Sequence, residues 1–358
     1  MHVLFVTGEY PPDIGGVGDY SACLRSAMSA LGVRTQVVSR REVGRWDARS
    51  LAWLVRKAPR TGIVHIQYQP GAFDLLGDVC LMPLLLRAAR PRVRLVTTLH
   101  DARVPYLFPG AGPLRWQAVK LLACTSHAVV AADERDLNAV GRTRYQVPIG
   151  SNVACAPPPA YDREAFRRQL GLEPHALAVA YFGLLNTSKG LDLLLDAFDL
   201  LLSARPDARM LMLGGSVGAS DPTDRLTTAR LRTRMRQTAV QQTGYLEPSA
   251  LSAHLLACDL ALLPYADGAS PRRGSLLACA AHGLPIVSTL PASQAVADAV
   301  LAEPADAQRL TTAVLNVVDD AALRVRLRAG AAALMERCSW QAIAQQHLRI
   351  YQTLCSQP

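Results

Sequence analysis

The sequence has few lysines, few aromatic residues and no cysteine pattern typical of a metal site. Only three of its 38 basic residues are lysines, and aromatic residues make up 6% of the chain. The eight cysteines stand singly, without a CxxC pair and without the spacing to histidine that a structural zinc site needs. This pattern argues against a disulfide framework and predicts reduced, mostly buried thiols in a cytoplasmic protein.

The sequence also lacks a long apolar run. The longest candidates, residues 78–89 and 191–202, contain charged residues or proline and fall short of the roughly 20 apolar residues of a membrane span. Residues 1–10 have neither the basic start nor the extended apolar core of a signal peptide, so they predict a first β-strand. We therefore expect a cytoplasmic protein.

Positive charge is abundant and unevenly distributed. The net charge is +9, of which residues 1–160 carry +8 and residues 161–358 carry +1. A basic half is typical of a protein with an anionic partner, such as a membrane surface, a lipid phosphate or a nucleic acid. A solvated arginine-rich surface is an equally good interpretation, so peripheral contact with the inner face of the membrane stays open. Because no basic stretch is interleaved with aromatics, we expect no nucleic-acid partner.

Strands and helices alternate along the first half of the chain. Apolar runs at 2–7, 35–38, 62–68, 94–99 and 128–131 predict strands, and residues 19–31, 74–89 and 114–124 have helical spacing; residues 147–152 predict a strand that runs into a loop. Right-handed crossovers between such strands make the sheet parallel. The pattern predicts a doubly wound α/β domain over residues 1–156.

A proline-rich linker separates this domain from a second series of the same kind. Residues 157–159 are all proline, and alternation resumes over residues 161–339. A chain of 358 residues has room for two such domains. The terminal helix predicted over 340–358 is a candidate to pack back on the first domain. We therefore predict two Rossmann-like α/β domains that face each other across a cleft.

A loop with two adjacent arginines lies between a predicted strand and a predicted helix of the second series. Ser270 and Pro271 favour a helix start, with Ser270 as the N-cap, and Gly283 suits the positive φ at the helix end. Free N–H groups, the helix dipole and the guanidinium groups of Arg272 and Arg273 would all attract an anion at this helix start. We predict that a diphosphate binds there.

Several short motifs occur in an order that matches a known family. They are Gly15-Gly16, His100-Asp101, Pro148 to Asn152, Phe182 to Leu185 with Lys189-Gly190, Gly244 to Leu246, the segment around Gly283, and Glu303 to Asp306. By this ordered set, the chain resembles family-4 retaining glycosyltransferases of the GT-B fold over nearly its whole length. The resemblance implies an N-terminal acceptor domain and a C-terminal donor domain, each Rossmann-like.

The chain departs from that family at two places. Where the family usually has an arginine shortly before the lysine, this chain has Leu184. The family's two glutamates, eight residues apart, fall on Ser270 and Ala278. In relatives the first glutamate lies near the transferred sugar and the second binds ribose hydroxyls, so donor binding is expected to differ here. Arg272 and Arg273 are candidates to replace some of these contacts.

The resemblance implies roles for residues in both domains. The implied catalytic residues are His100 and Lys189, and Lys189 would support the departing diphosphate. The implied donor-binding residues are Gly15, Gly16, Lys189, Tyr245, Leu246, Ser270, Arg272, Arg273, Gly274 and Ser275; the candidate acceptor-binding residues are Tyr68, Gln69 and Asp101. Structural roles are the alternative for several of these, such as a packed tyrosine, a capping aspartate, turn-shaping glycines, or an arginine paired with Asp267.

The expected activity is transfer of a sugar from a nucleotide-diphosphate sugar to an acceptor hydroxyl, with retention implied by the resemblance. No cofactor is expected beyond this donor substrate. No Asp-x-Asp motif ends a predicted strand, which predicts that no metal is needed. The acceptor is a glycan, a lipid-linked molecule or a small molecule. The alternatives are a noncatalytic nucleotide-sugar-binding or scaffold protein, motivated by the missing glutamates, and a sugar-nucleotide epimerase of the same fold.

Overall fold

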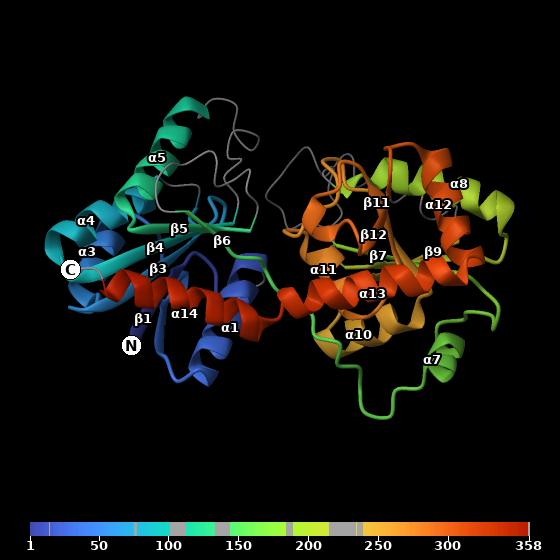
Figure 1. Ribbon diagram of the computed structural model, residues 1–358, viewed down its shortest axis with the longest axis horizontal. Helices are drawn as coiled ribbons and strands as arrows, with labels where there is room; N and C mark the ends of the chain where they lie inside the picture. Colours follow the sequence, from blue (N-terminus) through green and yellow to red (C-terminus); the bar gives the residue numbers. More distant parts are fainter. Residues whose placement is uncertain are drawn as a thin grey trace. The chain divides into compact units, whose positions relative to one another are not determined.

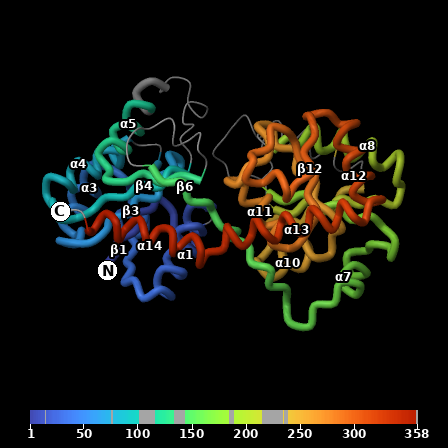
Figure 2. The backbone as a smooth tube through the Cα atoms, in the orientation of Figure 1, coloured from blue at the N-terminus to red at the C-terminus, as the bar shows by residue number. Residues whose placement is uncertain are grey.

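The computed structural model describes residues 1–13, 15–74, 77–100, 112–132, 144–183, 189–214, 234 and 239–356. The chain forms two compact units, and the first of them is discontinuous in sequence. The first unit comprises Met1–Asn152 together with Arg337–Pro358, and the second comprises Val153–Glu336. Figure 2 follows the chain out of the first unit, through the second and back again.

The first unit is built on a parallel sheet of six strands in the order β2-β1-β3-β4-β5-β6. The strands are β1 (His2–Thr7), β2 (Arg34–Val38), β3 (Gly62–Tyr68), β4 (Val93–Leu99), β5 (Ala128–Ala131) and β6 (Arg144–Gln146). In β1, Val3 and Phe5 belong to one core cluster, whereas Leu4 and Val6 belong to another. Apolar residues on both faces of a strand are expected when helices cover both faces of a parallel sheet.

Helices cover both faces of this sheet (Figure 1). They are α1 (Gly16–Ala30), α2 (Arg40–Val43), α3 (Ala48–Lys57), the 3-10 helix η1 (Asp78–Leu81), α4 (Met82–Ala89), α5 (Gly112–Thr125) and α14 (Trp340–Ser356). Residues of α1 and α14 pack in one core cluster, and residues of α3, α4 and α5 pack in the other. Each face of the sheet therefore has its own apolar core.

The terminal helix α14 packs in the first unit beside α1. Nε1 of Trp340 donates to the carbonyl oxygen of Ser151 at 2.8 Å. Gly150 makes room for the indole, because an added Cβ there would lie 2.7 Å from Cε2 of Trp340. A buried hydrogen bond of 3.2 Å joins Oη of Tyr20 on α1 to Nε2 of His347 on α14. The last helix of the chain thus completes the core of the unit formed by the first 152 residues.

The second unit repeats this architecture with a parallel sheet of six strands in the order β12-β11-β10-β7-β8-β9. The strands are β7 (Ala178–Phe182), β8 (Arg209–Leu213), β9 (Val240–Gly244), β10 (Leu260–Leu263), β11 (Ile286–Thr289) and β12 (Val300–Glu303); the helices are α7 (Arg163–Gln169), α8 (Leu191–Ala204), α10 (Pro248–Ala257), α11 (Gly274–Ala281), the 3-10 helix η5 (Gln294–Val296), α12 (Ala307–Asp319) and α13 (Ala321–Arg337). The predicted α/β class with two Rossmann-like units is confirmed.

Helix α11 begins later than the sequence predicts. Its N-cap is Arg273 and its first residue is Gly274, so the predicted start at Pro271 with Ser270 as the N-cap is wrong. The amide of Arg273 donates to the carbonyl oxygen of Ser270 at 3.1 Å, which closes a turn ahead of the helix. The helix end is as predicted, because Gly283 has a φ of +67° just after the C-cap.

Other elements also differ from their predicted bounds. Residues 74–89 are not one helix, because Asp74 has a φ of +56° and only a 3-10 turn precedes the start of α4. The sequence predicts a strand that begins at Val147. The observed strand, β6, lies just before this position and ends at Gln146. Strand β9 escaped prediction because its sequence, VQQTG, is largely polar and half-exposed at the edge of its sheet.

Gly190 joins Lys189 to α8 in a backbone conformation that favours glycine. Its φ is +66°, and an added Cβ would lie 1.9 Å from the carbonyl oxygen of Pro264. We predict that Gly190→Ala lowers the free energy of unfolding by more than about 3 kcal/mol, because left-handed strain and a backbone clash add together. Gly171 is the control: its φ is +69° but nothing lies near its Cβ position. Gly171→Ala should cost only about 1–2 kcal/mol. Denaturant unfolding of both variants measures this, and equal losses would contradict the clash.

Candidate functional site

The carboxyl ends of two neighbouring strands in the second unit carry a cluster of positive charge. Lys189 lies in the connection after β7, and Arg273 lies just before α11, beyond β10. Both contact one aromatic ring: Nζ of Lys189 lies 5.1 Å and Cζ of Arg273 lies 4.7 Å from the ring centroid of Tyr265. Ligands of open α/β sheets bind outside the carboxyl ends of the strands, so this edge is the candidate site.

Lys189 is held with little access to water. Burial lowers the pKa of its ammonium group from 10.5 to about 8, and the positive charge of Arg273 contributes to the shift. Gly183, at the end of β7, lies beside this side chain, because an added Cβ there would be in ordinary van der Waals contact with Cε of Lys189 at 3.7 Å. A poorly hydrated ammonium beside a guanidinium is unfavourable in isolation. The arrangement becomes favourable when an anion binds between the two groups.

Asp267 holds both arginines of the loop. Oδ2 of Asp267 accepts from Nη2 of Arg272 at 3.1 Å, and the carboxylate also pairs with Arg273. The sequence left open whether one arginine pairs with Asp267, and the structure shows that both do. Among the described residues, the cluster therefore holds three cations, Lys189 included, and one carboxylate, which pairs with the two arginines. Asp267 also orients the guanidinium groups, which reduces the conformational entropy lost when an anion binds.

The N-terminus of α11 lies at the same cluster. No described side chain caps it, so the amide groups of its first turn are available to an anion. Oγ of Ser275, in that first turn, forms a hydrogen bond of 2.7 Å with Oη of Tyr265. Gly274 has open space at its Cβ position, which lets a ligand approach the backbone. The structure thus brings four predicted donor residues, Lys189, Arg273, Gly274 and Ser275, together around Tyr265.

The two positions where the family has glutamates are both buried. Ser270 is 2% exposed, and its hydroxyl has no hydrogen-bond partner within the described chain. Ala278 is fully buried in α11. Neither residue offers a carboxylate, so any sugar or ribose contact must come from other groups at this edge.

The loop that carries Tyr265 is tied to the segment after β11. Oγ1 of Thr289 donates to the carbonyl oxygen of Tyr265 at 2.5 Å, and the amide of Ala269 donates to the carbonyl oxygen of Thr289 at 3.1 Å. Gly268 has a φ of +86°, and an added Cβ would lie 2.0 Å from the carbonyl oxygen of Pro291. These contacts fix the ring against which both cations lie, which is the support that a preorganised site needs.

Tyr245 and Leu246 directly follow β9, so they too lie at the carboxyl ends of the strands. Tyr245 is 63% exposed, and Leu246 is half-buried. Strand β8 separates β9 from β7, so the structure does not bring Tyr245 against the Lys189 cluster. An exposed aromatic ring at a ligand-binding edge is available for stacking on a planar ligand. The predicted contact of these residues with the donor stays a prediction.

A buried polar chain begins at His100, the residue after β4 in the first unit. Nε2 of His100 lies 2.8 Å from Oε1 of Gln67, and Nε2 of Gln67 lies 3.2 Å from Nε2 of His65. Because an amide oxygen accepts hydrogen bonds, His100 donates from Nε2 and keeps Nδ1 as an acceptor. Burial lowers the pKa of His100 to about 3, so the ring is neutral at physiological pH.

The polar chain continues from β3 to α14. The amide of Gln67 donates to Nε2 of His65, so Nδ1 of His65 donates to Oη of Tyr351 at 2.6 Å. The hydroxyl of Thr98 lies 2.7 Å from the same Nε2. The sequence analysis missed this network, although His65 and Gln67 alternate within an apolar strand and therefore point to one face. That alternation is the one local signal of a buried polar chain.

The glycines of the first loop lie at the start of α1. Gly15 is the N-cap of α1, and Gly16 is its first residue. An added Cβ at Gly15 would lie 1.7 Å from Oε2 of Glu9, so a side chain at this position would displace the glutamate. Nothing lies near the Cβ position of Gly16, which leaves the backbone accessible at a helix N-terminus.

Tyr68 and Gln69, predicted to bind the acceptor, make structural contacts. Tyr68 is 4% exposed and stacks on Phe73 with ring centroids 6.1 Å apart. Oε1 of Gln69 accepts from the amide of Ala72 at 2.7 Å and closes a turn. For Tyr68 this favours the packed tyrosine that the sequence left open as the alternative. Asp101 lies outside the described residues.

Solved structures with the same fold cover essentially the whole chain. Sucrose-phosphate synthase from Thermosynechococcus elongatus aligns with a TM-score of 0.75 at 17% identity, covering 99% of each chain. HepE from Anabaena, in complex with UDP and glucose, aligns with a TM-score of 0.74 at 16% identity, covering 99% of this chain and all of the other. The chain therefore has the GT-B fold of two Rossmann-like domains.

The sequence comparisons add the class of enzyme. Residues 176–320 match the family described as glycosyl transferases group 1. Over 95% of its length the chain is 27% identical to a D-inositol 3-phosphate glycosyltransferase from Jonesia denitrificans, covering 91% of that protein. Over 98% of its length it is 24% identical to a GDP-mannose-dependent monoacylated alpha-(1-6)-phosphatidylinositol monomannoside mannosyltransferase from Corynebacterium glutamicum, covering 97% of that protein. Together these matches support a glycosyltransferase of the GT-B fold.

The buried ammonium group of Lys189 makes the folded state less stable than it would be with a neutral side chain at this position. The pKa of about 8 in the folded state lies below the usual lysine value of 10.5, so the ammonium group destabilises the folded state below pH 8. We predict that Lys189→Met raises the free energy of unfolding at pH 7 by about 1–3 kcal/mol. The gain should shrink as the pH rises from 8 towards 10.5. Denaturant unfolding across this pH range measures it. Lys57→Met, at an exposed lysine, should leave the unfolding free energy nearly unchanged; a loss of stability in Lys189→Met would contradict the prediction.

Burial keeps His100 neutral, and the amide oxygen of Gln67 favours the tautomer with Nε2 protonated. We predict that Gln67→Glu raises the pKa of His100 from about 3 to above its usual value of 6.5, because a carboxylate would replace the amide oxygen 2.8 Å from Nε2. Histidine NMR titrations of the variant and of the unchanged chain measure this shift. The resonances of His127, on another part of the first unit, serve as the internal control. If His100 stays neutral at pH 5 in the variant, Gln67 does not set its protonation.

Proposed function

We propose that the protein transfers a sugar from a nucleotide-diphosphate sugar to an acceptor hydroxyl with retention of configuration at the anomeric carbon. The observation that carries this proposal is the pair of cations on Tyr265 beside the N-terminus of α11. The combination of an ammonium group, a guanidinium group and free helix amides suits a diphosphate better than any neutral ligand. The group 1 glycosyl transferase match covers this part of the chain.

The cations would act on the leaving group. In the proposed step, the bond between the anomeric carbon and the β-phosphate oxygen breaks, and its electron pair goes to the diphosphate. The acceptor oxygen bonds to the anomeric carbon on the same face, and its proton passes to a β-phosphate oxygen. Negative charge thus grows on the diphosphate in the transition state, where Lys189, Arg273 and the α11 amides would stabilise it. No side chain is required as the base.

The proposed chemistry needs no metal ion at the diphosphate. Lys189, Arg273 and the amides of α11 would balance the negative charge of the diphosphate that a divalent cation would otherwise balance. A bound diphosphate would also raise the pKa of Lys189 above its free value of about 8 and keep the ammonium group protonated. We therefore propose metal-independent transfer, with no cofactor beyond the donor.

The acceptor is proposed to carry a phosphate or to be linked to a lipid. The names of the two full-length relatives describe acceptors of this kind, an inositol phosphate and a phosphatidylinositol mannoside. The excess positive charge of residues 1–160 suits such an acceptor and suits peripheral contact with an anionic membrane surface. Within the described residues, no helix has the length and apolar character to cross a bilayer. Nδ1 of His100, the free acceptor of the neutral ring, is available to a sugar hydroxyl.

A noncatalytic nucleotide-sugar-binding protein is the second candidate. The observation behind it is the buried alanine at position 278, where relatives of this fold have a ribose-binding glutamate. Such a protein would bind the nucleotide and transfer nothing.

Donor binding and transfer are tested with UDP-, GDP-, TDP- and ADP-sugars. We expect one of these nucleotides to bind, and we expect Lys189→Ala or Arg273→Ala to weaken its affinity tenfold or more and to lower the rate of transfer further. Affinity for the nucleoside diphosphate should fall as the pH rises through about 8, because Lys189 then loses its charge. In Lys189→Arg this dependence should disappear. Calorimetric titration measures the affinity.

Lys57→Ala is the control, because Lys57 is exposed on α3 of the first unit. It should bind and transfer as the unchanged protein does. Absence of binding by every nucleotide would overturn the donor site. Tight nucleotide binding without transfer or donor hydrolysis would support the noncatalytic protein instead.

A further inference from the structure

A cavity of about 300 Å³ lies at the amino ends of the strands of the second sheet, and Lys189 lies at their carboxyl ends. Its walls include Leu177 and Leu260, at the amino ends of β7 and β10, the same strands whose carboxyl ends carry the Lys189 cluster. Strands of this length separate the two edges by roughly 15 Å. The cavity is therefore not part of the site proposed for the diphosphate.

Arginine dominates the polar lining of this cavity. The lining contains Arg163, Arg167, Arg205, Arg324 and Arg328, and Asp259 is the one carboxylate residue among the lining residues. Arg163 and Arg167 share Asp259, at 2.6 and 3.3 Å, and Arg205 pairs with Asp207 at 2.8 Å. Arg324 and Arg328 form no ion pair within the described part of the chain. The cavity thus has two guanidinium groups that no carboxylate balances.

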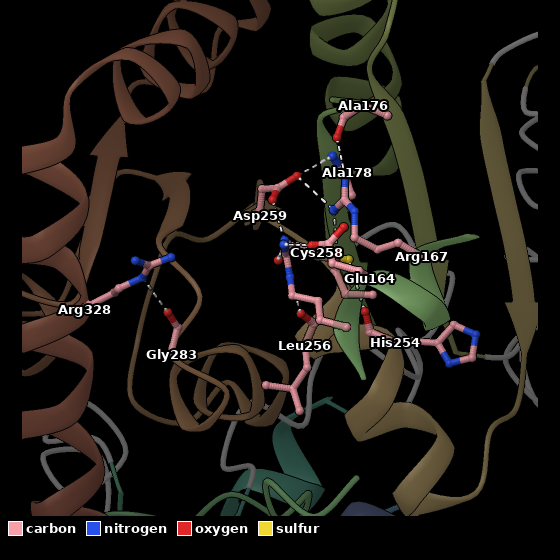
Figure 3. A network of polar contacts seen from close by, with 12 residues as sticks. Glu164, Arg167, Ala176, Ala178, His254, Leu256, Cys258, Asp259, Gly283 and Arg328 are labelled. Atoms are coloured by element: carbon pink, nitrogen blue, oxygen red, sulfur yellow. Dashed lines mark hydrogen bonds and ion pairs between the residues drawn. The ribbon is translucent and has the colours of Figure 1, made fainter. Parts of the chain in front are cut away.

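Arg167 is the most buried of these side chains. It is 3% exposed, and its Nη atoms donate to the carbonyl oxygens of Ala257 at 2.7 Å and Ala176 at 2.5 Å. Figure 3 shows it beside Asp259 and Ala178, whose amide donates to Oδ2 of Asp259 at 2.8 Å. Nε of Arg167 is buried and has no partner within the described residues. A buried donor left without an acceptor costs free energy that a bound anion would recover.

Arg324 and Arg328 lie four residues apart on α13 and therefore on one face of the helix. Nη1 of Arg324 donates to the carbonyl oxygens of Val317, at 2.9 Å, and Val318 near the end of α12. Nε of Arg328 donates to the carbonyl oxygen of Gly283 at 3.3 Å, as Figure 3 shows. These contacts use one nitrogen of each guanidinium group and hold both groups at the cavity. The remaining N–H groups can bind a second partner.

We propose that this cavity binds a small molecule through a phosphate group. Guanidinium forks bind phosphate oxygens in pairs, and two such forks stand here without a carboxylate. The aliphatic walls, which include Leu177, Leu260 and Val317, would contact the body of a phosphate ester. The volume is at the lower end for small-molecule sites, so the ligand is inorganic phosphate or a short phosphate monoester. This site is separate from the proposed sugar transfer and does not depend on it.

The test is calorimetric titration with inorganic phosphate and with glycerol 3-phosphate at constant ionic strength, using the full chain. It is run in the unchanged protein and in Lys189→Ala, which removes a cation of the other site. Phosphate binding should persist in Lys189→Ala. Arg328→Gln should weaken it about tenfold, and Arg324→Lys, which keeps the charge but loses the fork, should weaken it as well. A higher affinity for one of the two probes tells free phosphate from a phosphate ester.

Arg326→Gln is the matched control, because Arg326 lies on α13 between the two arginines and is exposed but does not line the cavity. It should bind phosphate as the unchanged protein does. Equal weakening in Arg326→Gln and Arg328→Gln would show a general effect of surface charge and overturn the proposal. Loss of all phosphate binding in Lys189→Ala, or chloride binding as strong as phosphate binding, would overturn it too.

Discussion

The second unit is organised around positive charge that is held away from water. Lys189 and Arg273 come from connections after two neighbouring strands, and both lie against the ring of Tyr265. A parallel sheet makes this possible, because it brings the carboxyl ends of strands distant in sequence to one edge. The ring supplies an aromatic face to both cations, and Asp267 orients the arginines without cancelling the whole charge. The loop contacts of Tyr265 with Thr289 fix the position of the ring that both cations contact.

The serine and alanine at the two glutamate positions bear on how the proposed diphosphate site would recognise the sugar and the ribose of its donor. Ser270 is buried, and Ala278 lies inside a helix whose apolar residues are almost all buried. Carboxylates at these positions would place negative charge close to the buried cations. Without them, the cluster carries less negative charge than two carboxylates would add. Under the proposed function, donor binding would depend on charge and helix amides more than on directed hydrogen bonds to hydroxyl groups.

The sequence was sufficient to predict the α/β class with two Rossmann-like units, because that class depends on local periodicity. It also predicted that Arg272 and Arg273 lie beside the N-terminus of α11, and their binding of an anion stays a prediction. It was not sufficient for the start of α11, since Ser270 and Pro271 carry helix-start signals that also suit the turn they form. Tyr265 was missed because no motif marks it, and its role comes from two cations that fold onto it. The polar chain from His100 was missed for a stronger reason: His65 and Tyr351 are 286 residues apart, and no local pattern joins them.

The place of α14 has a consequence for how the protein is made. The second unit is continuous in sequence, so it can fold as soon as residue 336 has left the ribosome. The first unit, although it is synthesised first, needs α14 to bury Tyr20 and to supply Tyr351 to His65. Part of one face of its sheet, on which α1 and α14 both pack, therefore stays uncovered until α14 has been synthesised. The second unit can thus complete its fold before the first, and the hydrogen-bond network that begins at His100 is complete only when Tyr351 of α14 has reached His65.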